Sequence, residues 1–242
     1  MKTFNSISLS ICLAVFFLAF LFLNQAGPAA AQVGVSQNQA SPQTSALPGE
    51  DQAELKAILK PARFDESDDK IELVVFFWYG CGSCRATDDT TDMFIDSLPP
   101  DVRALKLPAL FGNRTEWQAH GKLFMVLEAL GAEEKLRKLT FDTVQNVNNP
   151  SARGYSLLTR EAQEAFVVSQ GISKEDFNAA YDSAAVNDKM ARVKAFLDNS
   201  ELDAVPGMVV NGRYSFSFIP GPAYYQLAER LINQEKERLA GK

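Results

Sequence analysis

The chain has 242 residues and a formal net charge of −6, with 46% hydrophobic and 10% aromatic residues. This length suits one domain, or one domain with a large insertion, with enough apolar residues for a sizeable core. The acidic balance argues against a nucleic-acid partner, because proteins that bind nucleic acid present basic surfaces to the phosphates.

The N-terminal residues have the pattern of a secretory signal peptide. Lys2 supplies the positive start, residues 9–23 supply the apolar region, and the three alanines at 29–31 supply a small-residue cleavage site. We therefore predict a signal peptide over residues 1–31, cleaved near Ala31. The alternative is an uncleaved anchor, although the apolar run is short for a membrane span of about 20 residues.

The cysteine content restricts the possible chemistry. Cys12 lies within the predicted signal peptide, so Cys81 and Cys84 would be the cysteines of the mature chain. A structural zinc site needs about four ligands, and the single histidine, His120, is not sufficient to complete one. We therefore expect no metal site, and expect Cys81 and Cys84 to form an internal disulfide or dithiol.

The first half of the chain shows linker, helix and strand patterns in turn. Residues 32–50 are rich in Gln, Ser, Ala and Pro without apolar periodicity, which predicts a flexible linker. Residues 51–60 predict an amphipathic helix that ends before a proline. Residues 71–78 form a nearly continuous apolar run, typical of a buried central strand. A helix is predicted over 81–97 and a second strand over 102–107.

The second half is mostly helical and then returns to strands. Residues 115–199 show apolar residues at helical spacing, which we interpret as core packing. Residues 208–210 and 213–218 predict two strands, joined at Asn211-Gly212 by a type I′ hairpin turn. Pro222 is well placed to begin a final helix.

The spacing of Cys81-Gly82-Ser83-Cys84 is suited to a redox-active disulfide at a helix N-terminus. Residues three apart lie on one face of a helix, with a Cα separation of roughly 5 Å that a disulfide can bridge. Cys81 would meet the positive end of the helix dipole, which favours thiolate over thiol. Cys84 should be more buried and would resolve a mixed disulfide formed at Cys81. The alternative, a structural bridge, would give little chain-entropy stabilisation across so short a loop.

Two segments resemble a known family. Residues 76–84, which hold both cysteines, resemble the active-site segment of DsbA, the family of periplasmic thiol-disulfide oxidases with a thioredoxin fold. Residues 204–214 are similar to the family's cis-proline loop and the hairpin that follows it. The resemblance extends over about residues 51–240. It implies an α/β fold, with a thioredoxin-like domain over 51–242 and an inserted all-helical domain over about 112–203.

The resemblance also implies how the site works. The Val205–Pro206 peptide bond would be cis and lie against the disulfide, with the backbone of Val205 free to pair with an extended substrate peptide. The substrates would be cysteine-containing proteins of the periplasm. A DsbB-type inner-membrane partner coupled to quinone would reoxidise the protein, without a soluble cofactor. We expect a monomer.

Two features of the sequence depart from the family pattern. Family members typically have Pro-His between the cysteines, where this chain has Gly82-Ser83. The histidine helps to stabilise the nucleophilic thiolate, whereas Ser83 offers a hydroxyl hydrogen bond without positive charge. The family's buried acid, six residues before the first cysteine, is replaced by Val75, and Glu72 is the nearest acid on that strand. We therefore expect a milder oxidant than typical family members.

Two other functions remain open on the sequence alone. A reductase or isomerase could share the fold, although an isomerase usually has a dimerisation domain and residues 32–50 look too short and polar for one. A chaperone or binding module could carry an incidental disulfide. The redox potential separates the first alternative from an oxidase, and a Cys81→Ser variant tests the second.

Four other side chains have no assigned part in the chemistry of the two cysteines. We expect His120 to be a solvated or helix-capping residue rather than an acid–base catalyst. Trp78 and Tyr79 either lie at the floor of the active-site groove or pack in the strand's core. Arg85, next to Cys84, is expected to be a solvated helix residue.

Overall fold

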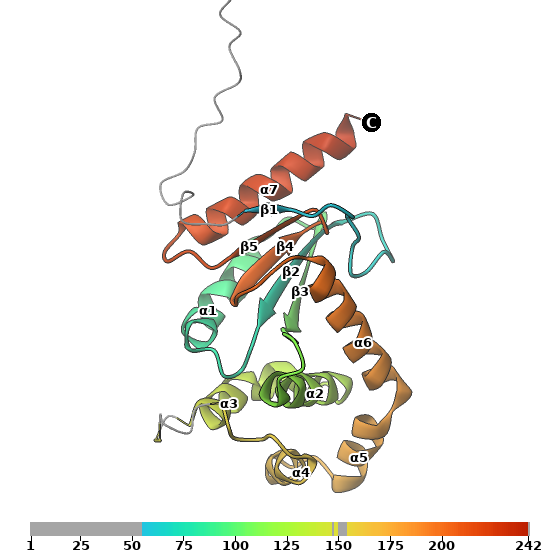
Figure 1. Ribbon diagram of the computed structural model, residues 1–242, viewed down its shortest axis with the longest axis vertical. Helices are drawn as coiled ribbons and strands as arrows, with labels where there is room; N and C mark the ends of the chain where they lie inside the picture. Colours follow the sequence, from blue (N-terminus) through green and yellow to red (C-terminus); the bar gives the residue numbers. More distant parts are fainter. Residues whose placement is uncertain (1–54, 147, 150–153, 242) are drawn as a thin grey trace, which may run out of the picture. The chain divides into compact units, whose positions relative to one another are not determined.

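The structure is a computed structural model, and it describes residues 55–146, 148–149 and 154–241 (Figure 1). The predicted signal peptide and the predicted linker lie outside the described residues. Among the helices that the structure describes, none combines the length and the apolar character needed to cross a membrane.

A five-stranded sheet, in the order β1-β5-β4-β2-β3, forms the centre of the fold. β2 (Ile71–Phe77) pairs in parallel with β3 (Val102–Pro108) and antiparallel with β4 (Gly207–Val210). β5 (Tyr214–Ser217) and β1 (Lys56–Ala57) extend the sheet with antiparallel pairs. Every residue of β2 is buried, which confirms the central strand that its apolar run predicts.

The helix predicted over residues 51–60 is wrong for the part of it that the structure describes. Lys56–Ala57 form β1, in which Lys56 is opposite Ser215, and the amide of Ile58 donates to the carbonyl of Arg213 across 2.8 Å. Helix propensities of ordinary residues differ by less than about 1 kcal/mol. Pairing with the open edge of β5 therefore outweighs the local helical pattern.

The described residues form seven helices, and five of them, α2–α6, lie between β3 and β4 in the chain. This arrangement places the helical insertion between the second strand of the parallel pair and the β4–β5 hairpin. In Figure 1, α6 runs back from the other insertion helices toward the sheet. The helices are α1 (Gly82–Ser97), α2 (Thr115–Ala129), α3 (Glu133–Gln145), α4 (Arg160–Ser169), α5 (Lys174–Asp182), α6 (Ala184–Asn199) and α7 (Ala223–Ala240).

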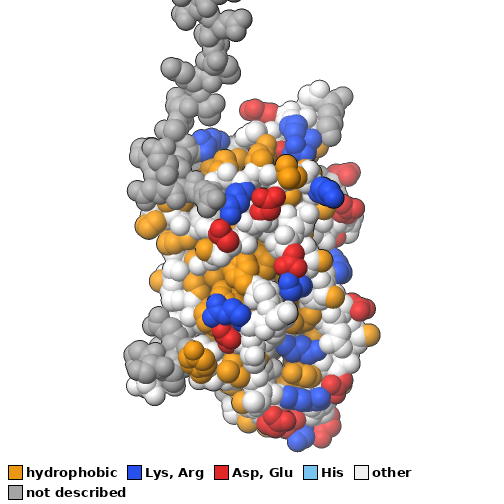
Figure 2. Space-filling view, viewed as in Figure 1, with side chains coloured by type: hydrophobic (Ala, Val, Ile, Leu, Met, Phe, Trp, Pro, Cys, Tyr) orange, Lys and Arg blue, Asp and Glu red, His pale blue; other side chains and the backbone are white. Residues whose placement is uncertain are grey.

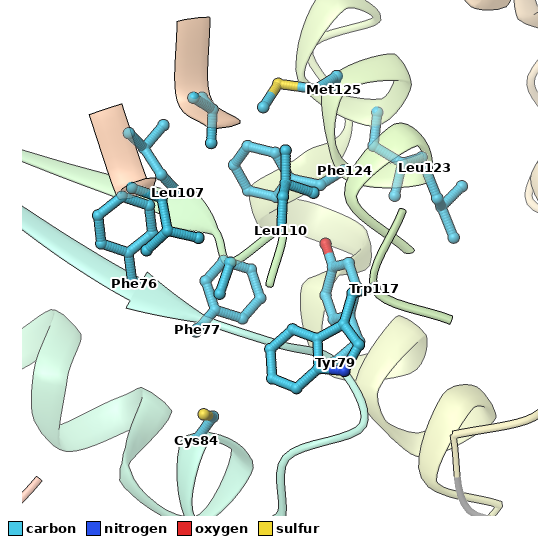
Figure 3. Close-up of a cluster of buried hydrophobic side chains, with 14 of the residues drawn as sticks. Phe76, Phe77, Tyr79, Cys84, Leu107, Leu110, Trp117, Leu123, Phe124 and Met125 are labelled. Carbon is cyan, nitrogen blue, oxygen red and sulfur yellow. The ribbon is translucent and has the colours of Figure 1, made fainter. Parts of the chain in front are cut away.

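Two hydrophobic clusters cover the two faces of the sheet. Successive side chains of a strand point to opposite faces, so Leu73 and Val75 belong to one cluster, while Val74 and Phe76 belong to the other. The first cluster is completed mainly by α7. The second is completed by the insertion helices and also contains the buried Cys84 (Figure 3). The second cluster therefore joins the helical insertion to the Cys81–Cys84 site.

The turn between β4 and β5 has the predicted type I′ geometry. Asn211 and Gly212 both have left-handed φ angles, 49° and 62°. Gly212 is also required by space, because a Cβ there would overlap the backbone of Ala62. The turn fixes the register of β4, whose first residue follows the Val205–Pro206 bond.

On the face shown in Figure 2, Lys and Arg side chains lie next to Asp and Glu side chains and do not gather into one basic surface.

Candidate active site

Cys81 and Cys84 form a disulfide where β2 gives way to α1. Their Cα atoms are 5.2 Å apart, in agreement with the spacing expected on the first turn of a helix. Cys81 is the N-cap residue of α1 and is partly exposed, whereas Cys84 is only 3% exposed. The difference in exposure leaves Cys81 as the sulfur that another protein can reach.

Two neutral donors surround the sulfur of Cys81. The backbone N–H of Cys84 donates to its Sγ across 3.0 Å, and the Ser83 hydroxyl lies 3.3 Å away. A disulfide sulfur has no proton, so Ser83 is the donor in that contact. After reduction the same groups would face a thiolate, which hydrogen bonds of this kind stabilise.

The Val205–Pro206 peptide bond is cis, as the family resemblance implies. The carbonyl oxygen of Val205 lies 3.5 Å from the Sγ of Cys81, although 124 positions separate the two residues. Pro206 is buried and has no N–H to present to the disulfide. The loop before β4 therefore lies directly beside the sulfur pair.

Gln145 of α3 supports the backbone of the site, and sequence reasoning missed it. Its Nε2 donates to the carbonyl of Tyr79 at 3.0 Å and to the carbonyl of Cys81 at 2.9 Å. Gln145 lies 64 positions after Cys81 and belongs to no motif, so no local signal could have identified it. Arg85 is exposed, as expected, and forms an ion pair with Asp142.

A groove of about 570 Å³ opens beside the disulfide. Three of its lining residues are aromatic, and the loop before the cis bond supplies another part of its wall. We call it the active-site groove; it is lined by Trp78, Cys81, Phe111, Arg114, Trp117 and residues 202–205.

His120 is 1% exposed, so the expectation of a solvated or capping histidine is wrong. Its Nδ1 accepts the indole N–H of Trp78 across 2.9 Å, and its Nε2 lies 2.7 Å from the carbonyl oxygen of Ser156. Burial lowers the pKa of His120 below its ordinary value. The helical pattern around His120 could not reveal this, because it does not say which neighbour covers a given face.

Val75 faces a cation from the neighbouring strand. Val75 is 3% exposed and lies opposite Lys106 in the β2–β3 register. The Lys106 ammonium pairs instead with Asp88 of α1, at 2.9 Å. Glu72 lies near the other end of β2, where its carboxylate accepts the backbone N–H groups of residues 64–65. Glu72 therefore does not replace the acid that the family carries at the position of Val75.

A buried ionic network lies behind Tyr79. The Tyr79 hydroxyl donates to the Glu133 carboxylate across 2.9 Å, and Arg137 pairs with Glu133 at 3.0 Å and with Asp92 at 2.9 Å. Burial, together with the charge of Glu133, holds the pKa of Tyr79 well above its ordinary value. Tyr79 therefore stays protonated and acts as a donor two residues before Cys81.

The part of the chain that the structure describes contains no group of three or more His, Cys, Asp or Glu side chains that could hold a metal ion.

Comparisons with known proteins point to one family. No protein-family model matches the chain. It is 36% identical over 225 residues to the thiol:disulfide interchange protein DsbA of Pseudomonas syringae pv. tomato, covering 92% of this chain and 97% of that protein. It is 37% identical over 176 residues to DsbA of Pseudomonas aeruginosa, covering 72% and 79% of the two chains.

Solved structures agree. The crystal structure of Pseudomonas aeruginosa DsbA matches with a TM-score of 0.67 and 34% identity, covering 78% of this chain and 95% of that one. The oxidoreductase DsbA of Xylella fastidiosa matches with a TM-score of 0.66 at 20% identity, which shows the shared fold.

Proposed function

Because the chain belongs to the DsbA family of thiol:disulfide interchange proteins and is a thiol-disulfide oxidoreductase with a thioredoxin-like fold, we propose that it donates its Cys81–Cys84 disulfide to cysteine-containing proteins of the periplasm. One observation carries this proposal. The sulfur of the partly exposed Cys81 lies beside the cis Val205–Pro206 loop, whereas Cys84 is buried.

The first step is attack of a substrate thiolate on the Sγ of Cys81. Attack on Cys84 is disfavoured because Cys84 is buried. A bond forms between the substrate sulfur and Cys81, the Cys81–Cys84 bond breaks, and its electron pair leaves on Cys84. The product is a mixed disulfide, and the Cys84 sulfur then takes up a proton.

The second step releases the oxidised substrate. Another thiolate of the substrate attacks the substrate sulfur of the mixed disulfide, and the electron pair leaves on Cys81. The N–H of Cys84 and the hydroxyl of Ser83 then stabilise the Cys81 thiolate. Two electrons have passed from the substrate dithiol to the protein, and of the two protons released one is on Cys84 and one is in solvent.

Turnover requires a second oxidant that restores the disulfide. Following the family resemblance, we assign this role to a DsbB-type inner-membrane partner coupled to quinone, with no soluble cofactor. We further propose that the protein acts as a monomer after removal of residues 1–31.

A reductase is the second candidate, because the donors that surround Cys81 are neutral. Stabilisation of the reduced thiolate is what makes a disulfide oxidising, and a hydroxyl stabilises an anion less than a cation does. Gly82-Ser83 therefore favours a milder oxidant than a Pro-His protein.

The test mixes the oxidised protein with a dithiol peptide and follows the peptide disulfide. We expect one peptide disulfide per protein without added oxidant, no product with Cys81→Ser, and a persistent mixed disulfide when Cys84→Ser is given an oxidised peptide. Function in the cell that survives Cys81→Ser would contradict the proposal and favour a chaperone. The reductase would be favoured if the protein keeps its disulfide when it is equilibrated with glutathione. A disulfide that glutathione does not reduce has a low reduction potential, as a reductase requires.

A further inference from the structure

The indole of Trp78 is held by groups from separate parts of the chain. The Trp117 ring stacks on it with centroids 4.4 Å apart and planes 17° from parallel. His120 accepts its N–H across 2.9 Å. Gly80 and Gly154 approach so closely that a Cβ at either position would press on the indole. The orientation of the indole is therefore set by its surroundings, and only one of these contacts is a hydrogen bond.

The same indole belongs to the active-site groove. Trp78 is partly exposed and lines the groove together with Cys81 and Val205. Its carbonyl oxygen accepts the backbone N–H of Cys81 across 2.9 Å. A change in the position of the indole would therefore alter the surface that a substrate meets next to the reactive sulfur.

The hydrogen bonds of His120 fix its protonation state. An indole N–H only donates and a carbonyl oxygen only accepts, so Nδ1 must be the acceptor from Trp78 and Nε2 must carry the proton donated to Ser156. A second proton on Nδ1 would place two donors against each other. His120 is 1% exposed and lies outside the set of residues that line the groove, and its hydrogen bond to Trp78 links it to that lining.

We propose that His120 is a positioning residue, which holds the Trp78 indole as the floor of the active-site groove for the peptide that flanks the substrate cysteine. The inference rests on the proposed function, since it concerns how that site binds its substrate. A fixed indole offers a flat apolar face, on which an aromatic side chain beside the cysteine would pack. A peptide with glycine beside the cysteine has no side chain to pack on the indole, so the indole would not strengthen its binding.

Two variants of His120 separate the two hydrogen bonds. His120→Asn places its amide oxygen near the position of Nδ1, so it keeps an acceptor for Trp78 and loses the bond to Ser156. His120→Gln places its amide near the position of Nε2, so it keeps the donor to Ser156 and loses the acceptor for Trp78. Each variant loses the imidazole ring and one hydrogen bond, which makes them matched controls for stability.

The measurement is the half-saturating peptide concentration for oxidation of two dithiol peptides by the pre-oxidised protein, one with tyrosine and one with glycine beside the cysteine. We expect His120→Gln to raise this concentration about ten-fold for the tyrosine peptide and less than about two-fold for the glycine peptide. His120→Asn should stay within about two-fold of the unmodified protein. The redox potential should be unchanged in both variants, and the indole fluorescence should shift in His120→Gln.

Equal effects of the two variants, or an unchanged tyrosine-peptide value in His120→Gln, would overturn the positioning role. If His120→Gln does not fold, His120→Leu serves in its place and is compared with His120→Asn, because both lose the bond to Ser156 and only His120→Leu loses the acceptor for the Trp78 N–H. His120→Leu should raise the tyrosine-peptide value selectively. Oxidation of neither peptide by the unmodified protein would instead refute the proposed function, a result that needs no variant and is therefore distinguishable.

Discussion

The side-chain amide of Gln145 donates a hydrogen bond to the carbonyl oxygen of Cys81 across 2.9 Å. A second bond from the same nitrogen reaches Tyr79 at 3.0 Å. Helix α3 of the insertion thus holds the turn from which the disulfide emerges. The insertion therefore contributes to the geometry of the sulfur pair as well as to the hydrophobic core.

Replacing Gln145 with Met should destabilise the protein by about 1–3 kcal/mol, because it removes two hydrogen bonds of about 1 kcal/mol each and leaves a carbonyl in a buried site unpaired. Urea unfolding of the oxidised protein measures this change. Gln170→Met is the control, since Gln170 is exposed and its side-chain amide donates to the hydroxyl of its neighbour Ser169. It should change stability by less than about 0.5 kcal/mol. Equal losses in the two variants would refute a special role for Gln145.

Replacing Ser83 with Ala should make the disulfide less oxidising. The variant removes the hydroxyl that lies 3.3 Å from the Cys81 sulfur and leaves the Cys84 N–H in place. We expect the reduction potential to fall by about 30 mV, which corresponds to about 1.4 kcal/mol. Equilibration with glutathione buffers measures it. Ser83→His should shift the potential in the opposite direction, and a fall in that variant would contradict the role given to position 83.

Replacing Arg137 with Met should cost about 3–5 kcal/mol of unfolding free energy. The change leaves the Glu133 carboxylate buried without its cation, and a buried charge that loses its partner is strongly destabilising. Lys194→Met is a matched control, because Lys194 and Asp198 form an ion pair of the same helical spacing at the surface. That variant should lose less than about 0.5 kcal/mol. Similar losses in both would show that the Glu133 carboxylate is solvated.

The contribution of His120 to stability should depend on pH. Its pKa is lowered in the folded protein, chiefly by burial, so near pH 6.5 and below the unfolded chain binds more protons than the folded protein. The free energy of unfolding should therefore fall as the pH falls through about 6.5 toward the folded pKa. The stability of the protein minus that of His120→Asn, measured by urea unfolding, should shrink from about pH 8 to about pH 5. A difference that is constant or grows on acidification would contradict a buried neutral imidazole.

The sequence alone was sufficient for the features that depend on local pattern. The continuous apolar run of 71–78 predicts β2 because a strand buried on both faces has no polar side to show, and Asn211-Gly212 predicts its turn because both residues accept left-handed φ angles. The spacing of Cys81 and Cys84 predicts the disulfide because residues three apart lie on one face of a helix, within reach of a sulfur–sulfur bond. The cis Val205–Pro206 bond followed from resemblance to a family and from no local preference.

Only the tertiary structure decided which distant groups meet at the sulfur pair. Residues 51–60 carry a helical pattern, yet the edge of β5 draws Lys56–Ala57 into the sheet. His120 and Gln145 sit on helices whose pattern does not say what covers them, and the packing of the insertion against β2 buries one beneath Trp78 and aims the other at Cys81. Local pattern is set by backbone preference and side-chain polarity within a few residues. Contacts across 42 or 64 positions depend instead on how the helices and strands pack. The sequence alone therefore identifies the reactive cysteines, whereas the residues that support them, His120 and Gln145, are identified only in the folded structure.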